Sequence, residues 1–381
     1  MPFRVVIYSP DEHIRYDLGT LDEQGVGGGI TARVRLAHAL ADLGHAVALF
    51  ANVPHQSISG GVQYRRHTDL TDVDADVFVA STSGGRYSLE SLCGVPVRTR
   101  LRILMVHGTA PPAALHYLQP DYIYAPSNFI RDCVVSRWGY PPECVFVSPR
   151  GVAGYLFEPD GSAVSRDPFA LVYAGHPSKG LAAAVGVLRH LRSHDPRYEL
   201  HVYGGDGLWG GYDEPPPVEL GLHYHGLIGQ RVLARALQTC QFSMNLQTRR
   251  EPFGMVVTDS MRAGCIVIAS PVGAYPELVR DGENGFLVPG APHSDETQAR
   301  VAALILGLAD DPARAARLRA SARRSVLDWQ TVAAVWESHW RWALDMETTP
   351  TGACPYCAGA SLQLADGLHC TACGRYERKP A

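Results

Sequence analysis

The sequence predicts two doubly wound α/β domains of similar size, followed by a small metal-binding module. Short runs rich in valine and isoleucine alternate with helix-period segments, a pattern typical of buried parallel strands joined by helices. The pattern runs to about residue 150 and restarts near residue 170, and four of the nine cysteines fall near the end of the chain. At roughly 150 residues per domain, 381 residues leave room for two such domains and a remainder.

The first domain is predicted to span residues 1–150. A helix over residues 31–43 carries Leu36, Leu40 and Leu43 on one face and ends at Gly44, and it separates the first two strands as in a right-handed βαβ unit. The predicted strands of this domain are 4–9, 46–51, 77–80, 103–107, 122–125 and 145–148.

The second domain is predicted to span residues 151–327, after a loop-rich boundary over residues 149–168. Helices are expected over residues 181–194 and 230–238. The predicted strands are 170–174, 199–203, 222–225, 242–245, 266–270 and 286–288.

A helical segment follows over residues 295–345, and four of the six tryptophans lie between Trp329 and Trp342. Their spacing predicts a helix over residues 328–347 that crosses back to the first domain and fills a core between the domains. A tryptophan-rich interaction surface is the alternative.

Four cysteines near the end of the chain have the spacing of a zinc site. Cys354 and Cys357 form one C-x2-C pair, and Cys370 and Cys373 form the second. Four thiolates complete a closed tetrahedral Zn²⁺ site, so the ion is predicted to be structural. We expect a zinc-ribbon-like module over residues 351–378 that folds on its metal, with a hairpin in the spacer. Two disulfides or a redox C-x2-C pair are the alternatives.

Other features of this module are expected to be secondary. Gly359 and Gly374 follow the two cysteine pairs, as the turns of such knuckles often require, and His369 is a spare donor beside Cys370. Arg375, Arg378 and Lys379 add too little charge to argue for nucleic-acid binding.

Composition excludes several classes of protein. The formal net charge of −4 argues against a nucleic-acid protein driven by bulk positive charge. No run approaches the roughly 20 apolar residues of a membrane helix, and the start of the chain does not have the pattern of a signal peptide. Membrane association is therefore not indicated, and scattered single cysteines favour a reducing compartment, so we expect a cytoplasmic protein.

Two glycine-containing turns are candidate phosphate sites. Gly28 and Gly29 lie in a glycine-rich loop that opens the first helix, where backbone N–H groups and the helix dipole favour an anion. In the second domain, His176 and Lys179 lie between a strand end and a helix start. The chain has 32 arginines and only two lysines, and Lys179 is the only lysine in the first 378 residues.

A second motif follows in the second domain. Glu251 and Asp259 are eight residues apart, and if a helix begins near Met255, Asp259 lies about one turn into it. The two acids then reach opposite ends of one ligand bound at the helix N-terminus.

Residues 251–264 resemble the E-x7-E region of GT-B glycosyltransferases of family 4, which are retaining and use sugar nucleotides. Residues 271–288, 126–128, 149–152 and 157–159 are also similar to that family. The resemblance covers about residues 1–345 and leaves out the cysteine module. It implies the GT-B fold, in which two Rossmann-like domains face a cleft.

The resemblance implies a role for each matched residue. Glu251 is implied to hold the donor sugar's hydroxyls, Lys179 to pair with the diphosphate and Asp259 to accept from the ribose hydroxyls. Backbone donors to the sugar and diphosphate are implied at Phe253, Gly254, Met255 and Val256. From the first domain, Gly28 and Gly29 are implied to face the phosphates, and His107 to lie beside the anomeric carbon.

Two departures from the family pattern stand out. Asp259 is one methylene shorter than the glutamate usual there. The family commonly places an arginine shortly before the lysine, whereas here His176 is the only nearby candidate, so it is expected to share in donor binding.

The implied activity is retaining transfer of a sugar from a nucleoside diphosphate sugar to an acceptor hydroxyl, without a catalytic metal. Lysine, helix N-termini and loop amides would stabilise the leaving diphosphate. The acceptor is expected near residues 10–25, 83–87 and 107–109, and is a small molecule, natural product or glycan. Another GT-B sugar-nucleotide enzyme, such as an epimerase, or an inactive scaffold that binds a partner through the zinc ribbon are the alternatives.

Overall fold

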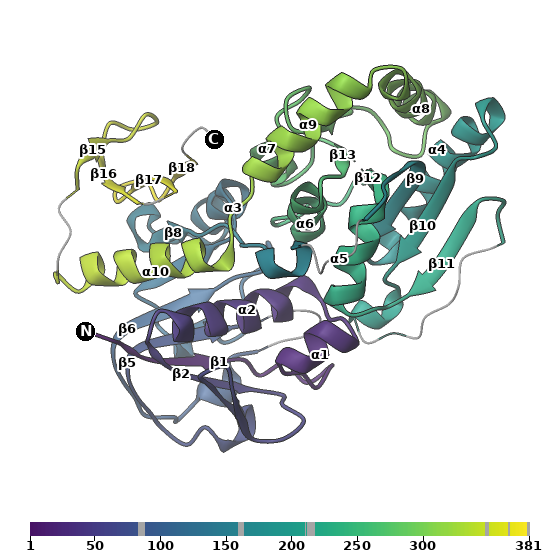
Figure 1. The fold of residues 1–381 in the computed structure, drawn as a ribbon. Helices are drawn as coiled ribbons and strands as arrows, with labels where there is room; N and C mark the ends of the chain where they lie inside the picture. Colours follow the sequence, from purple (N-terminus) through teal and green to yellow (C-terminus); the bar gives the residue numbers. More distant parts are fainter. Residues whose placement is uncertain are drawn as a thin grey trace. The chain divides into compact units, whose positions relative to one another are not determined.

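A computed structural model of the chain describes residues 1–82, 88–158, 164–209, 211, 218–346, 350–364 and 366–378 (Figure 1). The chain divides into two compact units. Unit 1 comprises Met1–Leu21, Val26–Gly151 and Leu327–Ala381, and unit 2 comprises Asp22–Gly25 and Val152–Val326.

Unit 1 is built on a sheet whose order, among the described residues, is β3-β4-β2-β1-β5-β6-β7-β8. Its neighbours pair in parallel, apart from the β3–β4 hairpin. The order reverses between β1 and β5, which is the switch point where doubly wound sheets bind ligands. The strands are β1 Arg4–Tyr8, β2 Ala46–Ala51, β3 Ser57–Ser59, β4 Val62–Arg66, β5 Val73–Ser81, β6 Val97–Met105, β7 Tyr122–Ala125 and β8 Val145–Val147.

The main helices of unit 1 are α2 (Gly28–Asp42), α3 (Asn128–Trp138) and α10 (Trp329–Ala343). Helix α2 begins three residues earlier than the sequence predicts. A short helix α1 (Leu18–Glu23) occupies part of the long loop expected after β1. Helix α3 was not predicted; the Ser127 hydroxyl caps it by accepting from the Ile130 N–H at 3.2 Å.

The tryptophan-rich helix α10 packs inside unit 1 on α2, where the sequence had indicated a core between domains. Trp336 and Trp340 are completely buried. The Trp336 indole donates to the Ser148 hydroxyl at 2.5 Å, and Trp340 meets the Phe3 ring edge-on. These indoles therefore anchor the returning chain within unit 1.

Unit 2 contains a parallel sheet with the order β11-β10-β9-β12-β13-β14 among the described residues. Its switch point lies between β9 and β12. The strands are β9 Asp167–Ala174, β10 Glu199–Tyr203, β11 Leu222–Gly226, β12 Cys240–Asn245, β13 Ile266–Ala269 and β14 Phe286–Leu287. The helices are α4 Leu181–His194, α5 Gln230–Thr239, α6 Met255–Ala263, α7 Tyr275–Leu278, α8 Asp295–Ala309 and α9 Pro312–Arg324.

Helices cover both faces of the unit 2 sheet at its central strands. The side chains of these strands alternate between the two faces, so each strand contributes to two cores. Leu171 and Tyr173 of β9 face the core beneath α4 and α8, whereas Ala170 and Val172 face the core beneath α5. Both faces are buried at the central strands β12 and β13, which explains why these strands read as continuous apolar runs, whereas β10 and β11 at the edge of the sheet expose one face.

The C-terminal module is a four-stranded antiparallel sheet with strands β15 (Gly352–Ala353), β16 (Ala360–Gln363), β17 (Gly367–Cys370) and β18 (Tyr376–Arg378). The β16–β17 pair is the hairpin expected in the spacer. Across the described residues, no helix is both long and apolar enough to span a membrane.

Candidate functional site

Lys179 stands at the carboxyl end of β9, beside the switch point of unit 2. The chain leaves β9 through Gly175, makes a short 3-10 turn over Pro177–Lys179 and enters α4. Gly180 adopts φ of 120°, and a Cβ there would lie 1.8 Å from the Leu246 carbonyl oxygen. Only glycine fits this close approach, so Gly180 lets Lys179 sit directly over the ends of β9 and β12.

Glu251 reaches the same place from the loop after β12. Its carbonyl accepts from the Ala274 N–H at 2.9 Å, which ties the loop to the segment that precedes α7. The Gln247 amide donates to the Glu251 carboxylate at 3.3 Å and to the Tyr275 hydroxyl at 2.7 Å. Burial raises the pKa of Tyr275 well above its usual value, and the charge of Glu251 raises it further, so the phenol stays protonated.

The structure brings the two predicted residues into contact. The Lys179 Nζ donates to both carboxylate oxygens of Glu251, at 2.9 and 3.2 Å. The side chains are 28% and 14% exposed, so the pair is neither sealed in the core nor free in solvent. A half-open pair at a switch point can exchange its partners for a charged ligand.

The helix after Glu251 begins where the sequence indicated, at Met255. Gly254 caps it with a left-handed φ of 108°, and a Cβ there would lie 2.6 Å from the Tyr275 ring. Phe253 is buried, whereas Met255 and Val256 are half-buried in the first turn, whose backbone N–H groups have no partner within the helix. Asp259 is half-buried one turn further along α6.

A cluster around Trp209 escaped the sequence analysis. Trp209 stacks on the His176 ring at 3.6 Å between centroids, and the Arg249 guanidinium lies 4.7 Å from the centroid of its indole ring. His176 also pairs with Asp206, at 3.0 Å from Nε2 to the carboxylate. Arg249 thus brings a second cation near Lys179, whose Nζ is 5.9 Å from the centroid of the same ring. The Arg-Arg dipeptide just before Glu251 was the available signal.

His107 belongs to unit 1, two residues beyond the end of β6, where it is half-buried. Its Nε2 lies 3.0 Å from the Ser81 hydroxyl, which in turn accepts from the Arg33 Nε at 3.2 Å. Arg33 occupies one acceptor site of the Ser81 hydroxyl, which keeps a second acceptor site and its proton, so this contact fits either tautomer of His107.

The surroundings of His107 keep it neutral. Burial lowers its pKa well below the usual value, and the positive charges of Arg150 and Arg33 lower it further. Arg150 is itself buried and donates to the Val106 carbonyl at 2.8 Å. A neutral imidazole offers one ring nitrogen as a hydrogen-bond donor and the other as an acceptor.

Behind Ser81 lies a fully buried charged network that the sequence analysis also missed. Arg33 and Asp11 are both completely buried, and they pair at 2.9 Å. Arg33 also donates to the Tyr16 hydroxyl. Arg33 lies seven residues before Leu40, on the buried face of α2. This spacing was the signal for a buried arginine.

Gly28 and Gly29 form the first turn of α2 in unit 1 and are not part of a separate loop. Gly27, which precedes the helix, has a φ of −64°, and Gly28 and Gly29 are helical. The backbone conformation therefore does not require glycine at these three positions. The predicted acceptor segment over residues 83–87 lies outside the described residues.

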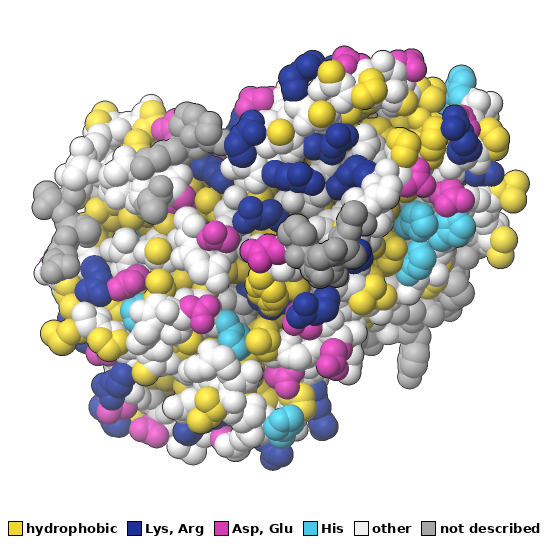
Figure 2. Space-filling view, in the orientation of Figure 1, with side chains coloured by type: hydrophobic (Ala, Val, Ile, Leu, Met, Phe, Trp, Pro, Cys, Tyr) yellow, Lys and Arg dark blue, Asp and Glu magenta, His cyan; other side chains and the backbone are white. Residues whose placement is uncertain are grey.

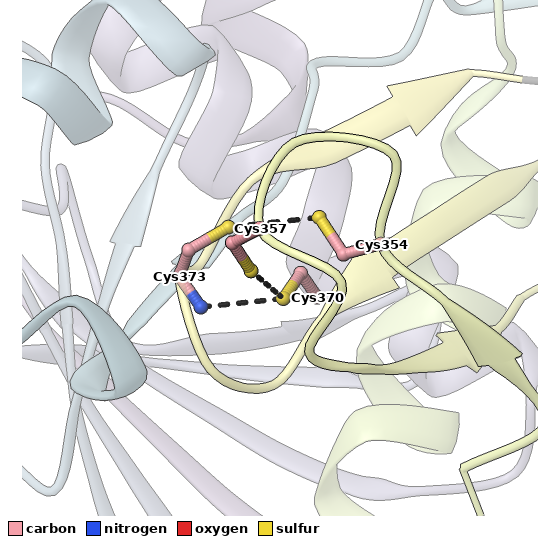
Figure 3. A group of neighbouring side chains, drawn as sticks. All are labelled: Cys354, Cys357, Cys370 and Cys373. Atoms are coloured by element: carbon pink, nitrogen blue, oxygen red, sulfur yellow. Dashed lines mark hydrogen bonds between the residues drawn. The ribbon is translucent and has the colours of Figure 1, made fainter.

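The four cysteines of the module converge from two turns (Figure 3). Sγ of Cys354 lies 3.8 Å from that of Cys373, and the Cys357 and Cys370 sulfurs are 3.6 Å apart. All four lie within 4.8 Å of one another. Sulfurs bonded to one tetrahedral zinc at about 2.3 Å are about 3.8 Å apart, whereas a disulfide needs about 2.05 Å. The donor set therefore fits zinc and does not fit two disulfides.

Backbone N–H groups support the thiolates. Those of Ala372 and Cys373 lie 3.4 and 3.2 Å from the Cys370 sulfur. Gly374 takes the left-handed conformation, with φ of 69°, as expected for the second knuckle. In the first knuckle, Ala358 takes the left-handed conformation and Gly359 does not. A Cβ added at Gly359 would lie 2.7 Å from the Cβ of Ala372.

The module docks on α3 and β8 of unit 1 (Figure 1). Asn128 exchanges two hydrogen bonds with the Tyr376 backbone, at 2.9 and 3.0 Å, and Arg375 pairs with Asp132 at 2.9 Å. Burial lowers the pKa of His369 to about 3, and its Nε2 accepts from the Val147 N–H at 3.3 Å. His369 is thus a packing residue of this interface, and the module shares a core with unit 1.

The comparisons agree with this architecture. Residues 168–310, which hold the Lys179–Glu251 pair, match the sequence model of a family described as Glycosyl transferases group 1. Over 192 residues the chain is 29% identical to a phosphatidyl-myo-inositol mannosyltransferase of Mycolicibacterium smegmatis, a match that covers 49% of each chain. It is 38% identical over 109 residues to a D-inositol 3-phosphate glycosyltransferase of Streptomyces avermitilis, covering 28% of this chain and 22% of that one. The chain spans about half the length, or less, of these curated relatives.

Solved structures resemble the chain over most of its length. A sucrose-phosphate synthase from Thermosynechococcus elongatus superposes with a TM-score of 0.64 at 17% identity, covering 90% of this chain and 100% of that one. Anabaena HepE, solved in complex with UDP-glucose, gives a TM-score of 0.61 at 16% identity over 90% of this chain and all of its own. At these identities the likeness shows the fold, which is the two-domain GT-B fold of glycosyltransferases.

Proposed function

We propose that this protein is a retaining glycosyltransferase that moves a sugar from a nucleoside diphosphate sugar to an acceptor hydroxyl. The observation that carries the proposal is the half-open Lys179–Glu251 pair at the switch point of unit 2. It lies inside the segment that matches the glycosyltransferase family, and a structural neighbour was solved with UDP-glucose bound.

Lys179 and the N-terminus of α6 supply the positive charge that a diphosphate needs. Lys179 is a compact ammonium, and the first-turn N–H groups of Met255 and Val256 add the favourable end of the helix dipole. Charge that develops on the leaving diphosphate is stabilised most strongly where such donors are already in place. Arg249, held over Trp209, is a second source of positive charge and compensates for the arginine missing before Lys179.

Donor binding would rearrange the ion pair. A diphosphate attracts Lys179 away from Glu251, and the released carboxylate then accepts hydrogen bonds from the hydroxyls of the sugar. Asp259, one turn into α6, is assigned to the ribose hydroxyls. His107, from unit 1, is assigned to the sugar near the anomeric carbon, where the ring nitrogen that does not contact Ser81 would hydrogen-bond to the sugar. Gly28 and Gly29, also from unit 1, are assigned to the phosphates.

The donor site is proposed to act without a catalytic metal, because amide and ammonium donors take the place of a divalent cation. We separately propose that the cysteine module binds one Zn²⁺ as a structural ion. Four thiolates leave no open coordination position for chemistry. Elemental analysis of the purified chain should find one zinc per chain, and Cys370→Ser should abolish it.

The activity is tested by incubating the protein with a panel of nucleoside diphosphate sugars and candidate acceptors, read by mass spectrometry of the products. We expect one donor to be consumed, with retention at the anomeric carbon by NMR of the glycoside. Lys179→Ala and Glu251→Ala should each lower turnover about a hundredfold or more.

The matched control is Arg280→Ala, which breaks an exposed ion pair with Glu283 in the same unit. Its turnover should stay within twofold of the unaltered protein, since exposed pairs contribute little to stability. Interconversion of the sugar nucleotide without transfer would instead support the epimerase-like alternative. Absence of any nucleotide binding would support the inactive scaffold.

A further inference from the structure

A row of histidines lies on the strands at the edge of the unit 2 sheet, away from Lys179 and Glu251. His201 of β10 is directly opposite His223 of β11, and His225 follows two residues later. The alternate residues of the same strands, such as Leu200 and Val202, are buried under α4. The histidines therefore share the other face, and Figure 2 shows histidine side chains gathered over this part of unit 2.

Two of these imidazoles have the spacing of metal ligands. The distance from His201 Nδ1 to His225 Nε2 is 3.1 Å. Two nitrogens bonded to one tetrahedral ion at about 2.0–2.1 Å are about 3.3 Å apart, so an ion fits between them with little movement of either ring. His225 is exposed and the His201 side chain is 25% exposed, which leaves the remaining coordination positions open to water.

The neighbours of this pair hold it in place. The Glu199 carboxylate lies 3.9 Å from His201 Nε2, the ring nitrogen opposite the proposed ligand atom. At this distance the carboxylate is beyond hydrogen-bond range, and its negative charge favours a cation at the imidazole. Tyr203 stacks on His225, with 4.5 Å between centroids and 10° between ring planes. His223 stacks on the other side of His201 and lies 3.4 Å from the same carboxylate.

Both candidate ligands are also predisposed to the neutral state that a metal requires. Burial lowers the pKa of His201 below its usual value, and the nearby His223 and His225 lower it further. Burial, then His223, lowers the pKa of His225 in the same direction. Neutral imidazoles compete well for borderline ions such as Zn²⁺, Co²⁺ and Ni²⁺.

We propose that unit 2 binds a divalent transition-metal ion between His201 Nδ1 and His225 Nε2, with the negative charge of Glu199 nearby. This site is separate from the four cysteines of the C-terminal module. It does not depend on the proposed glycosyltransferase activity, because none of its residues belongs to the Lys179–Glu251 site.

The test uses the full chain, loaded with zinc and dialysed to remove loosely held metal. Equilibrium dialysis against Ni²⁺, with nickel and zinc both measured by elemental analysis, should find one nickel per chain while the zinc content stays constant. His201→Ala and His225→Ala should each lose the bound nickel. Glu199→Gln removes a nearby negative charge and should weaken nickel binding about threefold.

His190→Ala is the matched control, since His190 is an accessible histidine of unit 2 that pairs with Asp295 at 3.0 Å. It should bind nickel as the unaltered chain does. Thermal unfolding without nickel monitors the fold of each variant, and His225→Gln replaces any alanine variant that unfolds early. No bound nickel in the unaltered chain, or full binding in both the His201 and His225 variants, would overturn the proposal.

Discussion

The switch point of each unit holds an ion pair, and the two pairs differ in their exposure to solvent. In unit 1, Arg33 and Asp11 pair with no exposed surface, and Arg33 also bonds to Tyr16 and Ser81. In unit 2, Lys179 and Glu251 pair with 28% and 14% of their side chains exposed. Breaking a buried ion pair that has all its hydrogen bonds costs much free energy, whereas a partly exposed pair can exchange one partner for a ligand at a lower cost. The same place in the fold thus serves as a scaffold in one unit and as a candidate binding site in the other.

The largest expected effect comes from breaking the unit 1 network. Arg33→Met leaves the Asp11 carboxylate buried without its cation, so we expect a loss of about 3–5 kcal/mol in the free energy of unfolding. Urea unfolding followed by tryptophan fluorescence is a suitable measurement, because five of the six tryptophans belong to unit 1. A loss below about 1 kcal/mol would show that the network is not a scaffold.

Breaking the unit 2 pair should have the opposite profile. Lys179→Ala should lower kcat/KM about 10²–10³-fold, because a preorganised donor to the leaving group is lost. The free energy of unfolding should change by no more than about 1 kcal/mol, since the pair is partly solvated. Measuring both quantities on one preparation checks the contrast. If Lys179→Ala were strongly destabilised but kept its turnover per folded molecule, the contrast between the two units would be contradicted.

Acid should destabilise unit 1 more than unit 2. Burial lowers the pKa of both His107 and His339 well below their usual value, so these residues are neutral in the folded chain. The unfolded chain takes up protons near pH 6.5, and stability is therefore full above that pH and is lost as the pH falls below it. Each histidine contributes up to about 1.4 kcal/mol per pH unit.

Urea unfolding at pH 6.5 and 5.5, again read at the unit 1 tryptophans, measures this loss. His339→Gln should reduce the dependence on pH, whereas a variant of the partly exposed His190 should leave it unchanged. Equal pH dependence in all three proteins would argue against buried neutral histidines as its source.

The smallest expected effect separates charge from shape at the unit 2 site. Lys179→Arg keeps the positive charge but puts a planar guanidinium into a turn where Gly180 already approaches the backbone closely. We expect turnover to fall about tenfold or more, with stability unchanged. Near-normal turnover would mean that codon usage alone accounts for the scarcity of lysine in this chain.

Sequence reasoning recovered what depends on local pattern. The main parallel strands of both units, the start of α6 at Met255 and the hairpin between the cysteine pairs follow from periodicity, capping and spacing, whereas α1, α3, β3 and β4 were not predicted. Lys179 and Glu251 were each identified separately, and their contact follows from the parallel sheet, which places the ends of β9 and β12 side by side. The sequence analysis did not predict this ion pair, because it assigned each side chain to a different part of the donor.

Sequence reasoning failed where partners are distant in the chain. Arg33 and Ser81 are 48 residues apart, and Trp209 reaches His176 and Arg249 from a loop with no periodic signal. The docking of the cysteine module depends on Asn128 and Asp132, which lie more than 240 residues before their partners. Short edge strands such as β3 and β4 have too few residues to show a period.

Calorimetric titration of UDP, GDP, ADP and TDP into the full chain and into Lys179→Ala tests the central claim most directly. The account predicts that at least one diphosphate binds the unaltered chain and that Lys179→Ala binds it at least tenfold more weakly, with Arg280→Ala unchanged. Failure of every diphosphate to bind, or equal affinity for the unaltered chain and Lys179→Ala, would contradict it.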